Sequence, residues 1–433
     1  MQSRSSRFTL RRIGRAIQFR IFRIPSILKK VARKVLPVSV QETLRKRIVW
    51  FERRWVAQVL KGDEQALAEV LEQHRDDPRP IIVFPPSLDW NTQLFQRPQQ
   101  LALSLARQGA LVFYCQPKPD RSKPQLEQIR DGLYLCNVLA QTFEIIEQPN
   151  VVVLTWNCGY MKYFNSPHVV YDYVDDINVF YADHDEVVRN HERMKCEAQT
   201  ILVTAHKLYD EIAPVRADAV YCPNGVDYDH FAIARQTDGG SVPQDLREII
   251  GEKKPVIGYY GALARWFDYA LLKQIALARP QYNYLLIGPD YDGSLEPAGL
   301  TSLPNLHWLG VKSYWELPNY LRAFDVAMIP FILNDITHAT SPLKLFEYMA
   351  GGKPVVVTPM RESTSYEGVL VASGADEFAS KLDEALRLAK DPAYQALLDR
   401  VARENTWDAR AKQIIDVLSQ SCKVKSGIVE SVA

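Results

Sequence analysis

Apolar residues in the first part of the chain recur at intervals of three and four, which is the spacing of one face of an α-helix. Basic side chains fill much of the remaining surface of this helix, and Pro25 is expected to kink or divide it. The pattern predicts a helical extension over residues 1–78. The apolar positions of its stripe are Leu10, Ile13, Ile17, Ile21, Ile24, Leu28, Val31 and Val35.

From Pro80 onward the pattern changes to short apolar runs separated by helical segments. Short buried strands that alternate with helices are typical of a mostly parallel sheet covered on both faces. Helices are expected at 98–108, where Gly109 follows the last turn, and around 183–198. Strands are expected at 80–84, 110–115, 151–156, 169–173, 201–204 and 219–222.

A stretch rich in glycine, serine and proline at 237–244 interrupts the alternation, which then resumes. The second set of strands is expected at 256–260, 284–287, 306–309, 326–330 and 354–358. The chain is therefore predicted to be an α/β protein with two facing, Rossmann-like, doubly wound domains and ligand-binding loops at the carboxyl ends of their strands. The expected parts are the extension 1–78, a first domain 79–236, a linker 237–250, a second domain 251–405 and a helix with tail 406–433.

Composition agrees with a globular protein, since 47% of the 433 residues are hydrophobic and 24% are charged. No apolar run is long enough to span a bilayer, and no signal-peptide pattern is recognised, so we expect a cytoplasmic protein. The six cysteines are scattered without a C-x-x-C pair, and the histidines have no metal-ligand spacing. Reduced, buried thiols are expected, with no metal site.

The charge is distributed very unevenly along the chain. Residues 1–61 contain 17 Lys or Arg and only two acidic residues, whereas the remainder has a net charge of −14. A basic helix with an apolar stripe is typical of a segment that lies on an anionic membrane surface. Packing against the protein itself or a partner is the alternative, and nucleic acid is disfavoured because no base-stacking pattern accompanies the charge. We expect peripheral attachment to the inner face of the cell membrane.

The segment 340–356 contains the most informative chemistry. Ser341 is a suitable N-cap and Pro342 suits the first helical position, so a helix is expected to begin here. Lys344 and Glu347 are three residues apart and share a face near the helix start. The free backbone N–H groups, the helix dipole and the lysine suit a diphosphate, and Glu347 has the acceptor oxygens for a ribose diol. The alternative is a capped surface helix on which Lys344 and Glu347 pair in solvent.

Four motifs place this segment in a wider pattern. They are Leu-Phe-Gln-Arg-Pro-Gln-Gln-Leu-Ala at 94–102, Val-Val-Tyr-Asp-Tyr-Val-Asp-Asp at 169–176, Pro-Asn-Gly-Val-Asp-Tyr-Asp-His-Phe at 223–231, and Pro-Leu-Lys-Leu-Phe-Glu-Tyr-Met-Ala-Gly-Gly-Lys-Pro-Val-Val at 342–356. With them, residues 80–420 resemble glycosyltransferase family 4 and its close GT-B relatives. The resemblance implies a GT-B fold, in which the third motif closes the first domain and the fourth forms the donor site.

By this resemblance, Glu347 is the second glutamate of the family's Glu-x7-Glu signature and binds ribose. The first glutamate falls at Ala339, which is a departure from the pattern. That carboxylate usually contacts the transferred sugar, so Asp335, His338 or the loop backbone are the alternatives here. The identity of the sugar and the stereochemical outcome are left open by this difference.

The remaining donor residues also follow from the resemblance. Gly261 would permit close backbone approach to phosphate, and Arg265 would supply a second cation, with a solvated loop arginine as the alternative. Val311 lies in the segment whose backbone reads the nucleobase. Donor binding is thus expected at Gly261, Val311, Ser341, Lys344 and Glu347, with catalytic charge stabilisation by Lys344 and Arg265.

On the acceptor side, Asp175 and Asp176 follow an expected strand and should face the cleft. Asp175 is predicted to act on the acceptor hydroxyl and Asp176 to orient the acceptor, with capping of the next helix as the alternative. Gln96 and Arg97 begin the helix at 98–108. Arg97 would hold a phosphate or carboxylate, although packing of the helix start explains it almost as well.

The resemblance therefore implies a hexosyltransferase-type enzyme that moves a sugar from a nucleotide-diphosphate donor to a glycan or lipid-linked acceptor in cell-surface polysaccharide synthesis. Retention of the anomeric configuration is expected, and neither a metal nor another cofactor is required. The helix 409–418 after Trp407 is expected to dock back across the domain interface. The alternatives are a GT-B nucleotide-sugar epimerase and a non-catalytic nucleotide-sugar-binding module.

Overall fold

The computed structural model describes residues 38–77, 79–179, 184–236, 243–251 and 254–430. The chain divides into two compact units, residues 1–65 and residues 66–433. The apolar stripe predicted between Leu10 and Val35 lies outside the described residues. In the first unit, the described residues belong to helix α3 (Val38–Gln73), which continues into the second unit.

Eight strands of the described residues form the first sheet, in the order β3-β4-β2-β1-β5-β6-β7-β8. All neighbouring strands pair in parallel except β3 and β4, which pair antiparallel. The strands are β1 (Ile81–Phe84), β2 (Leu111–Cys115), β3 (Leu126–Arg130), β4 (Leu133–Cys136), β5 (Asn150–Val153), β6 (His168–Tyr173), β7 (Thr200–Val203) and β8 (Val220–Tyr221). The helices of this domain are α4 (Arg97–Arg107), α5 (His184–Glu197) and α6 (His206–Ile212), whereas Phe231 of α7 (Tyr228–Ala232) packs in the core of the second domain.

Six strands form the second sheet, in the order β11-β10-β9-β12-β13-β14, and all pair in parallel. The strands are β9 (Val256–Tyr260), β10 (Asn283–Ile287), β11 (Leu306–Trp308), β12 (Val326–Ile329), β13 (Val355–Val357) and β14 (Val369–Val371). The helices that follow Gln236 are α8 (Gln244–Gly251), α9 (Tyr269–Ala278), α10 (Leu295–Ala298), α11 (Leu317–Arg322), α12 (Asp335–His338), α13 (Leu343–Ala350), α14 (Ala375–Leu388), α15 (Pro392–Glu404) and α16 (Trp407–Glu430).

Every predicted strand is present, within a few residues of its expected limits. The sequence pattern missed β3, β4 and β14. The β3 strand lies at an edge of the first sheet and has mostly exposed polar side chains. The β14 strand has only three residues and lies at an edge of the second sheet. Neither strand therefore has the buried apolar run of a central strand.

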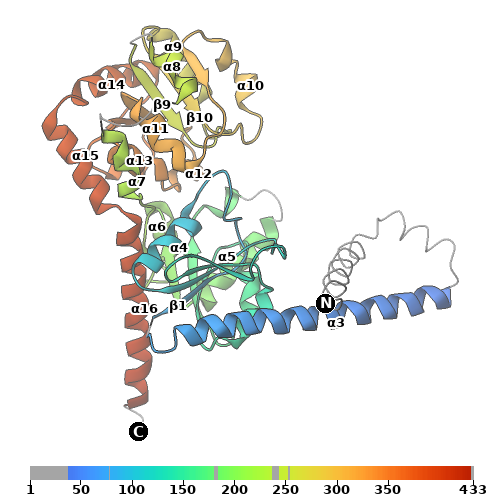
Figure 1. The fold of residues 1–433 in the computed structure, drawn as a ribbon. Coiled ribbons are helices and arrows are strands. Elements are labelled where there is room, and N and C mark those ends of the chain that lie inside the picture. Colours follow the sequence, from blue (N-terminus) through green and yellow to red (C-terminus); the bar gives the residue numbers. More distant parts are fainter. Residues whose placement is uncertain (1–37, 78, 180–183, 237–242, 252–253, 431–433) are drawn as a thin grey trace, which may run out of the picture. The chain divides into compact units, whose positions relative to one another are not determined.

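Alternate residues of the first sheet's strands enter two separate cores. Val83 packs in one core, whereas Ile82 and Phe84 pack in the other, as the two-residue period of a strand requires. The second core also receives Leu101 of α4 and Trp407 of α16. The C-terminal helix therefore returns from the second domain to pack beside α4, as expected (Figure 1).

Three predicted limits differ from the structure. Phe231 and Ala234, at the end of the expected first domain 79–236, pack in the core of the second domain. Val70 lies within the expected extension 1–78 but packs in a core of the first domain. The end of α3, from residue 66, accordingly belongs to the second compact unit. The second half of the expected linker 237–250 forms α8, because Leu246 and Ile249 provide an apolar face that the second domain buries.

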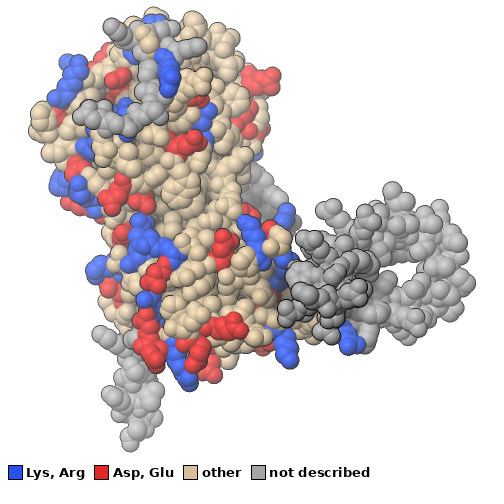
Figure 2. Space-filling model, in the orientation of Figure 1, with Lys and Arg blue, Asp and Glu red and all other residues tan. Residues whose placement is uncertain are grey.

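Lysine and arginine side chains are interspersed with aspartate and glutamate on the face drawn in Figure 2. Within the part of the chain that is described, no helix has the length and apolar character needed to cross a membrane.

Candidate active site

Three glycine turns follow neighbouring strands of the second sheet. Gly261 follows β9, Gly288 follows β10 and Gly310 follows β11, with φ of 140°, 137° and 65°. The Gly288 N–H donates to the Gly310 carbonyl oxygen at 2.8 Å. A Cβ at Gly288 would lie 1.9 Å from the Gly261 carbonyl oxygen, so only glycine permits this packing. The turns form a close-packed backbone surface at the carboxyl edge of the sheet.

Helix α13 begins beside this surface, but its cap differs from the predicted one. Pro342, not Ser341, is the N-cap, and no side chain caps the helix. The Ser341 hydroxyl instead accepts a hydrogen bond from the Asn224 backbone N–H at 3.1 Å. The predicted capping role of Ser341 is therefore wrong, because the helix begins one residue later and the Ser341 hydroxyl contacts the first domain. The helix start is left without a side-chain acceptor, which suits an external anion.

The opposite end of α13 is capped by a cation. The Arg235 guanidinium donates to the carbonyl oxygens of Met349 and Ala350, at 2.8 and 2.6 Å. These are among the last carbonyl groups of the helix, where a positive charge is favourable. The helix is therefore held at its C-terminal end while its N-terminal end faces the glycine turns.

Lys344 is brought against Gly261, as the sequence analysis expected. A Cβ at Gly261 would lie 2.7 Å from Lys344 Cε. The ammonium lies 5.4 Å from the Tyr259 ring centroid and 5.3 Å from that of Phe331. Burial lowers the pKa of Lys344 to about 8, against the opposing effect of the Glu347 carboxylate. Among the described residues, no carboxylate lies within ion-pairing distance of Lys344.

Glu347 lies one turn further along α13 and is only 6% exposed. Burial raises its pKa to about 7, while Lys344 and the Tyr260 hydroxyl favour the ionised form. The buried Tyr260 hydroxyl itself has no hydrogen bond of full geometry with any described residue. A buried carboxyl group with unfilled acceptor capacity suits a ligand that brings hydroxyl donors. The solvent-exposed Lys344–Glu347 pair, considered as an alternative, is not what the structure contains.

Arg265 and Val311 lie near the same edge in different settings. The Arg265 side chain is exposed, and its Nε lies 3.3 Å from Asp292 Oδ2, so its charge is already partly neutralised. Val311 follows Gly310 and is 38% exposed. Beside it, the Trp308 indole donates to the Gly288 carbonyl oxygen at 2.9 Å. Val311 is therefore placed with the glycine turns, whereas Arg265 fits the solvated loop arginine considered as the alternative.

Asp175 is an acidic group of the first domain with a raised pKa. It follows β6 and is partly exposed. Burial raises its pKa to about 7, assisted by the neighbouring carboxylates Asp172 and Asp176 and opposed by Arg97. A carboxyl group that titrates near neutrality suits proton transfer with an acceptor hydroxyl.

Asp176 does not match its predicted role. It is 6% exposed. Its Oδ1 accepts from the Asn178 backbone and side chain at 2.9 and 2.7 Å, and its Oδ2 lies 3.4 Å from Lys207 Nζ. Asp176 therefore caps the following turn, as the alternative reading proposed, rather than facing an acceptor.

Arg97 is also a structural residue. Its guanidinium is 4% exposed and forms a bidentate pair with Asp172, with contacts of 2.9 Å from both Nε and Nη2. Its Nη1 donates to Pro223 O and Asn224 Oδ1, each at 3.3 Å. The predicted acceptor contact is wrong because protein groups already occupy these donors. Gln96, the residue before α4, is partly buried and donates its backbone N–H to Gln99 Oε1.

Ala339, at the position of the missing glutamate, is fully buried and packs in a core of the first domain. Of the two alternatives, the Asp335 carboxylate is 91% exposed and pairs with Lys207 at 3.2 Å. His338 Nδ1 accepts from the Arg361 backbone N–H at 3.1 Å. Both side chains are thus used within the protein.

Sequence reasoning missed an aromatic contact between the domains. The Tyr314 hydroxyl accepts from Gln100 Nε2 at 2.7 Å, and Phe95 packs on Tyr314 at 5.1 Å between ring centroids. Trp315 is 59% exposed beside them. In the sequence, the adjacent aromatic residues Tyr314 and Trp315 were the feature that could have indicated this contact. A cavity of about 230 Å³ lies elsewhere, lined by Arg107 and Arg403 among others, and none of the predicted site residues lines it.

Sequence comparison finds a family match within the second domain. Residues 254–388 match the family of group 1 glycosyl transferases. TuaH of Bacillus subtilis (strain 168), assigned as a teichuronic acid biosynthesis glycosyltransferase, is 28% identical over 217 residues. That match covers 48% of this chain and 53% of TuaH, so the chain spans about half the length of this relative.

Two solved structures have the same architecture as this chain. Sucrose-phosphate synthase from Thermosynechococcus elongatus has a TM-score of 0.59 and 17% identity over 80% of this chain and 100% of that one. Anabaena Alr3699/HepE in complex with UDP-glucose has a TM-score of 0.58 and 16% identity over 79% and 99%. These likenesses confirm the GT-B fold. With the group 1 match, they confirm the resemblance to GT-B glycosyltransferases and are compatible with family 4.

Proposed function

We propose that this chain is a glycosyltransferase that uses a nucleotide-diphosphate sugar as donor. The observation that carries the proposal is Lys344, a cation without an ion-pairing partner among the described residues, at the uncapped start of α13 and against the Gly261 turn. Glu347 lies one turn further on the same helix. The group 1 match over 254–388 contains all three residues.

In this proposal the diphosphate binds between the first turn of α13, Lys344 and the glycine turns. Charge develops on the leaving diphosphate as the glycosidic bond breaks. A fixed ammonium and a helix dipole stabilise that charge without reorganisation, which is the logic of an oxyanion hole. Glu347 accepts hydrogen bonds from the ribose hydroxyls, and the backbone near Val311 contacts the nucleobase. Arg265 is exposed and paired with Asp292, so we assign it at most a secondary part.

The acceptor is proposed to be a glycan or a lipid-linked glycan, used in the synthesis of a cell-surface polysaccharide. The assignment of TuaH to teichuronic acid biosynthesis supports this class. Asp175 is proposed to orient the acceptor hydroxyl or receive its proton, because its pKa of about 7 permits both protonation states near neutrality. Retention of configuration and independence from metals are parts of the proposal that rest on the family resemblance.

Donor binding is tested by calorimetry with UDP, GDP, ADP, CDP and dTDP. We expect one or two of them to bind the wild-type protein. The Lys344→Met variant should bind that nucleotide about 10- to 100-fold more weakly, because a charge-assisted contact is lost. The control is Lys412→Met, which removes an exposed ion pair with Asp416 within α16. Its nucleotide affinity should equal that of the wild-type protein. The proposal fails if the folded wild-type protein binds none of the five.

Transfer is tested with labelled nucleotide sugars and an acceptor panel. A new glycoside supports the transferase, and the anomeric configuration of the product reports retention or inversion. Ala339 favours one second candidate, a non-catalytic nucleotide-sugar-binding module, because the usual sugar-contacting carboxylate is absent. Donor binding without transfer, hydrolysis or epimerisation would identify that module.

We also propose that residues 1–61 attach the protein to an anionic membrane surface on the cytoplasmic side, from their charge of +15 and their apolar stripe. Flotation with anionic and neutral vesicles compares the full chain with a variant that lacks these residues. The full chain should float with anionic vesicles, and the shortened chain should stay in solution. Equal partitioning of both proteins would reject the attachment.

A further inference from the structure

Helix α6 of the first domain faces the second domain with three polar residues. Lys207 pairs with Asp335, and the Asp210 carboxylate accepts from Arg361 at 2.6 Å. His206 donates its backbone N–H to the carboxylate of Glu362, which is fully buried, at 2.9 Å. Three successive contacts from one short helix fix α6 against the segments on either side of α13 in the sequence. The contact made by Lys207 differs from the other two because its ammonium lies near a carboxylate of each domain.

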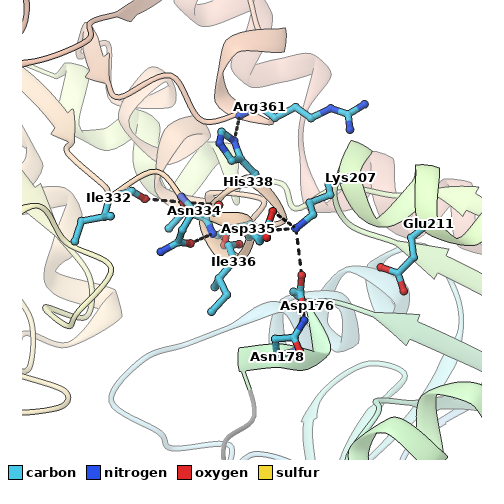
Figure 3. A network of polar contacts seen from close by, with 12 residues as sticks. Asp176, Asn178, Lys207, Glu211, Ile332, Asn334, Asp335, Ile336, His338 and Arg361 are labelled. Atoms are coloured by element: carbon cyan, nitrogen blue, oxygen red, sulfur yellow. Dashed lines mark hydrogen bonds and ion pairs between the residues drawn. The ribbon is translucent and has the colours of Figure 1, made fainter.

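Lys207 bridges two carboxylates from different domains (Figure 3). Its Nζ lies 3.4 Å from Asp176 Oδ2 in the first domain and 3.2 Å from Asp335 Oδ1 in the second. It also donates to the Asp335 backbone carbonyl oxygen at 2.8 Å. Because Lys207 also contacts the backbone, it holds the main chain at residue 335 in addition to the exposed Asp335 side chain. The Asp176 carboxylate is 6% exposed, so this end of the bridge is anchored in the first domain.

The loop held by Lys207 is cross-linked by hydrogen bonds between its own residues. The Asn334 side chain accepts from the Thr337 N–H at 2.9 Å, and the Thr337 hydroxyl donates to the Ile332 carbonyl oxygen at 2.6 Å. His338 accepts from the Arg361 N–H (Figure 3). The following residue, Ala339, is buried. Because these hydrogen bonds connect its residues, a change in the position of residue 335 is expected to shift the whole loop. The loop ends at residue 340, immediately before Ser341 and the start of α13.

We propose that Lys207 is a positioning residue for the donor site: it fixes the loop 332–340 against Asp176 of the first domain and so sets where the start of α13 lies relative to that domain. This inference rests on the proposed function. Ala339 provides no carboxylate at the position where the family has one, so the loop contributes to the site through its position and its backbone. Lys207 supplies the charge that keeps Asp176 and Asp335 together, since two carboxylates alone would repel each other.

The geometry is tested first without any substrate, by hydrogen exchange of the backbone amides in 332–342. In Lys207→Met the exchange should become about tenfold faster, because the charged contacts that oppose local opening are lost. Lys207→Arg retains a cation that reaches both carboxylates and should restore most of the protection. Lys412→Met is the control, because its ion pair with Asp416 lies within α16 and spans no domain interface. Unchanged exchange in a folded Lys207→Met variant would overturn the inference.

The second measurement separates positioning from binding. With the donor identified from the calorimetric panel, Lys207→Met should bind the nucleoside diphosphate within about twofold of wild type, since Lys344 and Glu347 are intact. Its kcat should fall about tenfold or more, because a donor bound at the displaced helix start is no longer aligned with the acceptor groups of the first domain. Lys207→Arg should recover most of that loss. A fall in nucleotide affinity as large as the fall in kcat would contradict positioning and assign Lys207 to donor binding.

Failure of the proposed function is distinguishable from failure of this inference. If the wild-type protein binds no nucleotide, the function is wrong, whereas the exchange experiment still decides whether Lys207 fixes the loop. If the nucleotide binds and both the exchange of 332–342 and kcat are unaffected in Lys207→Met, the function stands and the inference is rejected.

Discussion

Asn224 holds Ser341 by two of its polar groups. The Asn224 backbone N–H donates to the Ser341 hydroxyl at 3.1 Å, and the Asn224 side-chain amide donates to the Ser341 carbonyl oxygen at 2.8 Å. Ser341 precedes Pro342, the N-cap of the helix that carries Lys344. The Asn224–Ser341 pair therefore fixes the position of the proposed donor site relative to the first domain. Asn224 is 8% exposed and Ser341 4%, so water does not readily replace either contact.

We expect Asn224→Ala to lower kcat/KM about tenfold, since one buried hydrogen bond is lost and the Ser341 carbonyl is left unsatisfied. Steady-state kinetics on the identified donor measure this effect. Ser341→Ala should have a smaller effect of the same kind, and the double variant should lose less than the sum of both. Asn165→Ala, at an exposed position, serves as the control. Full additivity of the two changes would contradict a shared role.

The pH dependence of kcat/KM should be bell-shaped with its maximum between about 7 and 8. The pKa of Glu347 is raised to about 7, so below that pH it becomes protonated and loses acceptor capacity for the ribose. The pKa of Lys344 is lowered to about 8, so above that pH it loses the charge that attracts the diphosphate. Activity therefore falls on both sides.

Two substitutions assign the limbs of this profile. Lys344→Arg should move the alkaline limb upward by more than a unit, because arginine stays protonated throughout this range. Glu347→Gln should remove the acid limb and lower activity by about 10² at the optimum. Asp175 also has a raised pKa of about 7, so persistence of the acid limb in Glu347→Gln and its loss in Asp175→Asn would assign that limb to Asp175.

Gly261→Ala should weaken nucleotide binding by at least tenfold. The new methyl group would lie 2.7 Å from Lys344 Cε, so the ammonium must move, and the backbone φ of 140° is strained for alanine. Gly293→Ala is the matched control, since its φ is also positive, at 74°, and no atom lies within 4 Å of the added carbon. Calorimetry distinguishes the two. Equal loss of affinity in both variants would show that backbone strain alone is responsible.

Arg97→Met should destabilise the first domain strongly, by about 3–5 kcal/mol, because the carboxylate of Asp172 would remain buried without its partner. Denaturant unfolding measures the shift of the midpoint. Arg400→Met removes an exposed pair with Glu367 and should leave the midpoint unchanged. A stable Arg97→Met protein with weakened acceptor binding would instead restore the acceptor role that the structure argues against.

The sequence alone determined the features that depend on local spacing. Short apolar runs predicted the central strands of both sheets except β4, and the interval of three between Lys344 and Glu347 placed both on α13. Gly261 after β9 was expected to permit close approach of a phosphate, and the structure places the Lys344 side chain against this glycine. These features follow from periodicity and backbone sterics, which act over a few residues and can therefore be read from neighbouring positions.

Only the tertiary structure decided which polar residues remain available to a ligand. Arg97, Asp176 and Ser341 were plausible contacts, but Asp172, Lys207 and Asn224 respectively occupy them. Each of those partners lies at least 30 residues away in the chain, so no local pattern could reveal the pairing. Lys207 was missed for the same reason. A charged side chain binds whatever the fold places beside it, and that placement is fixed only when the two sheets and their connecting loops have packed.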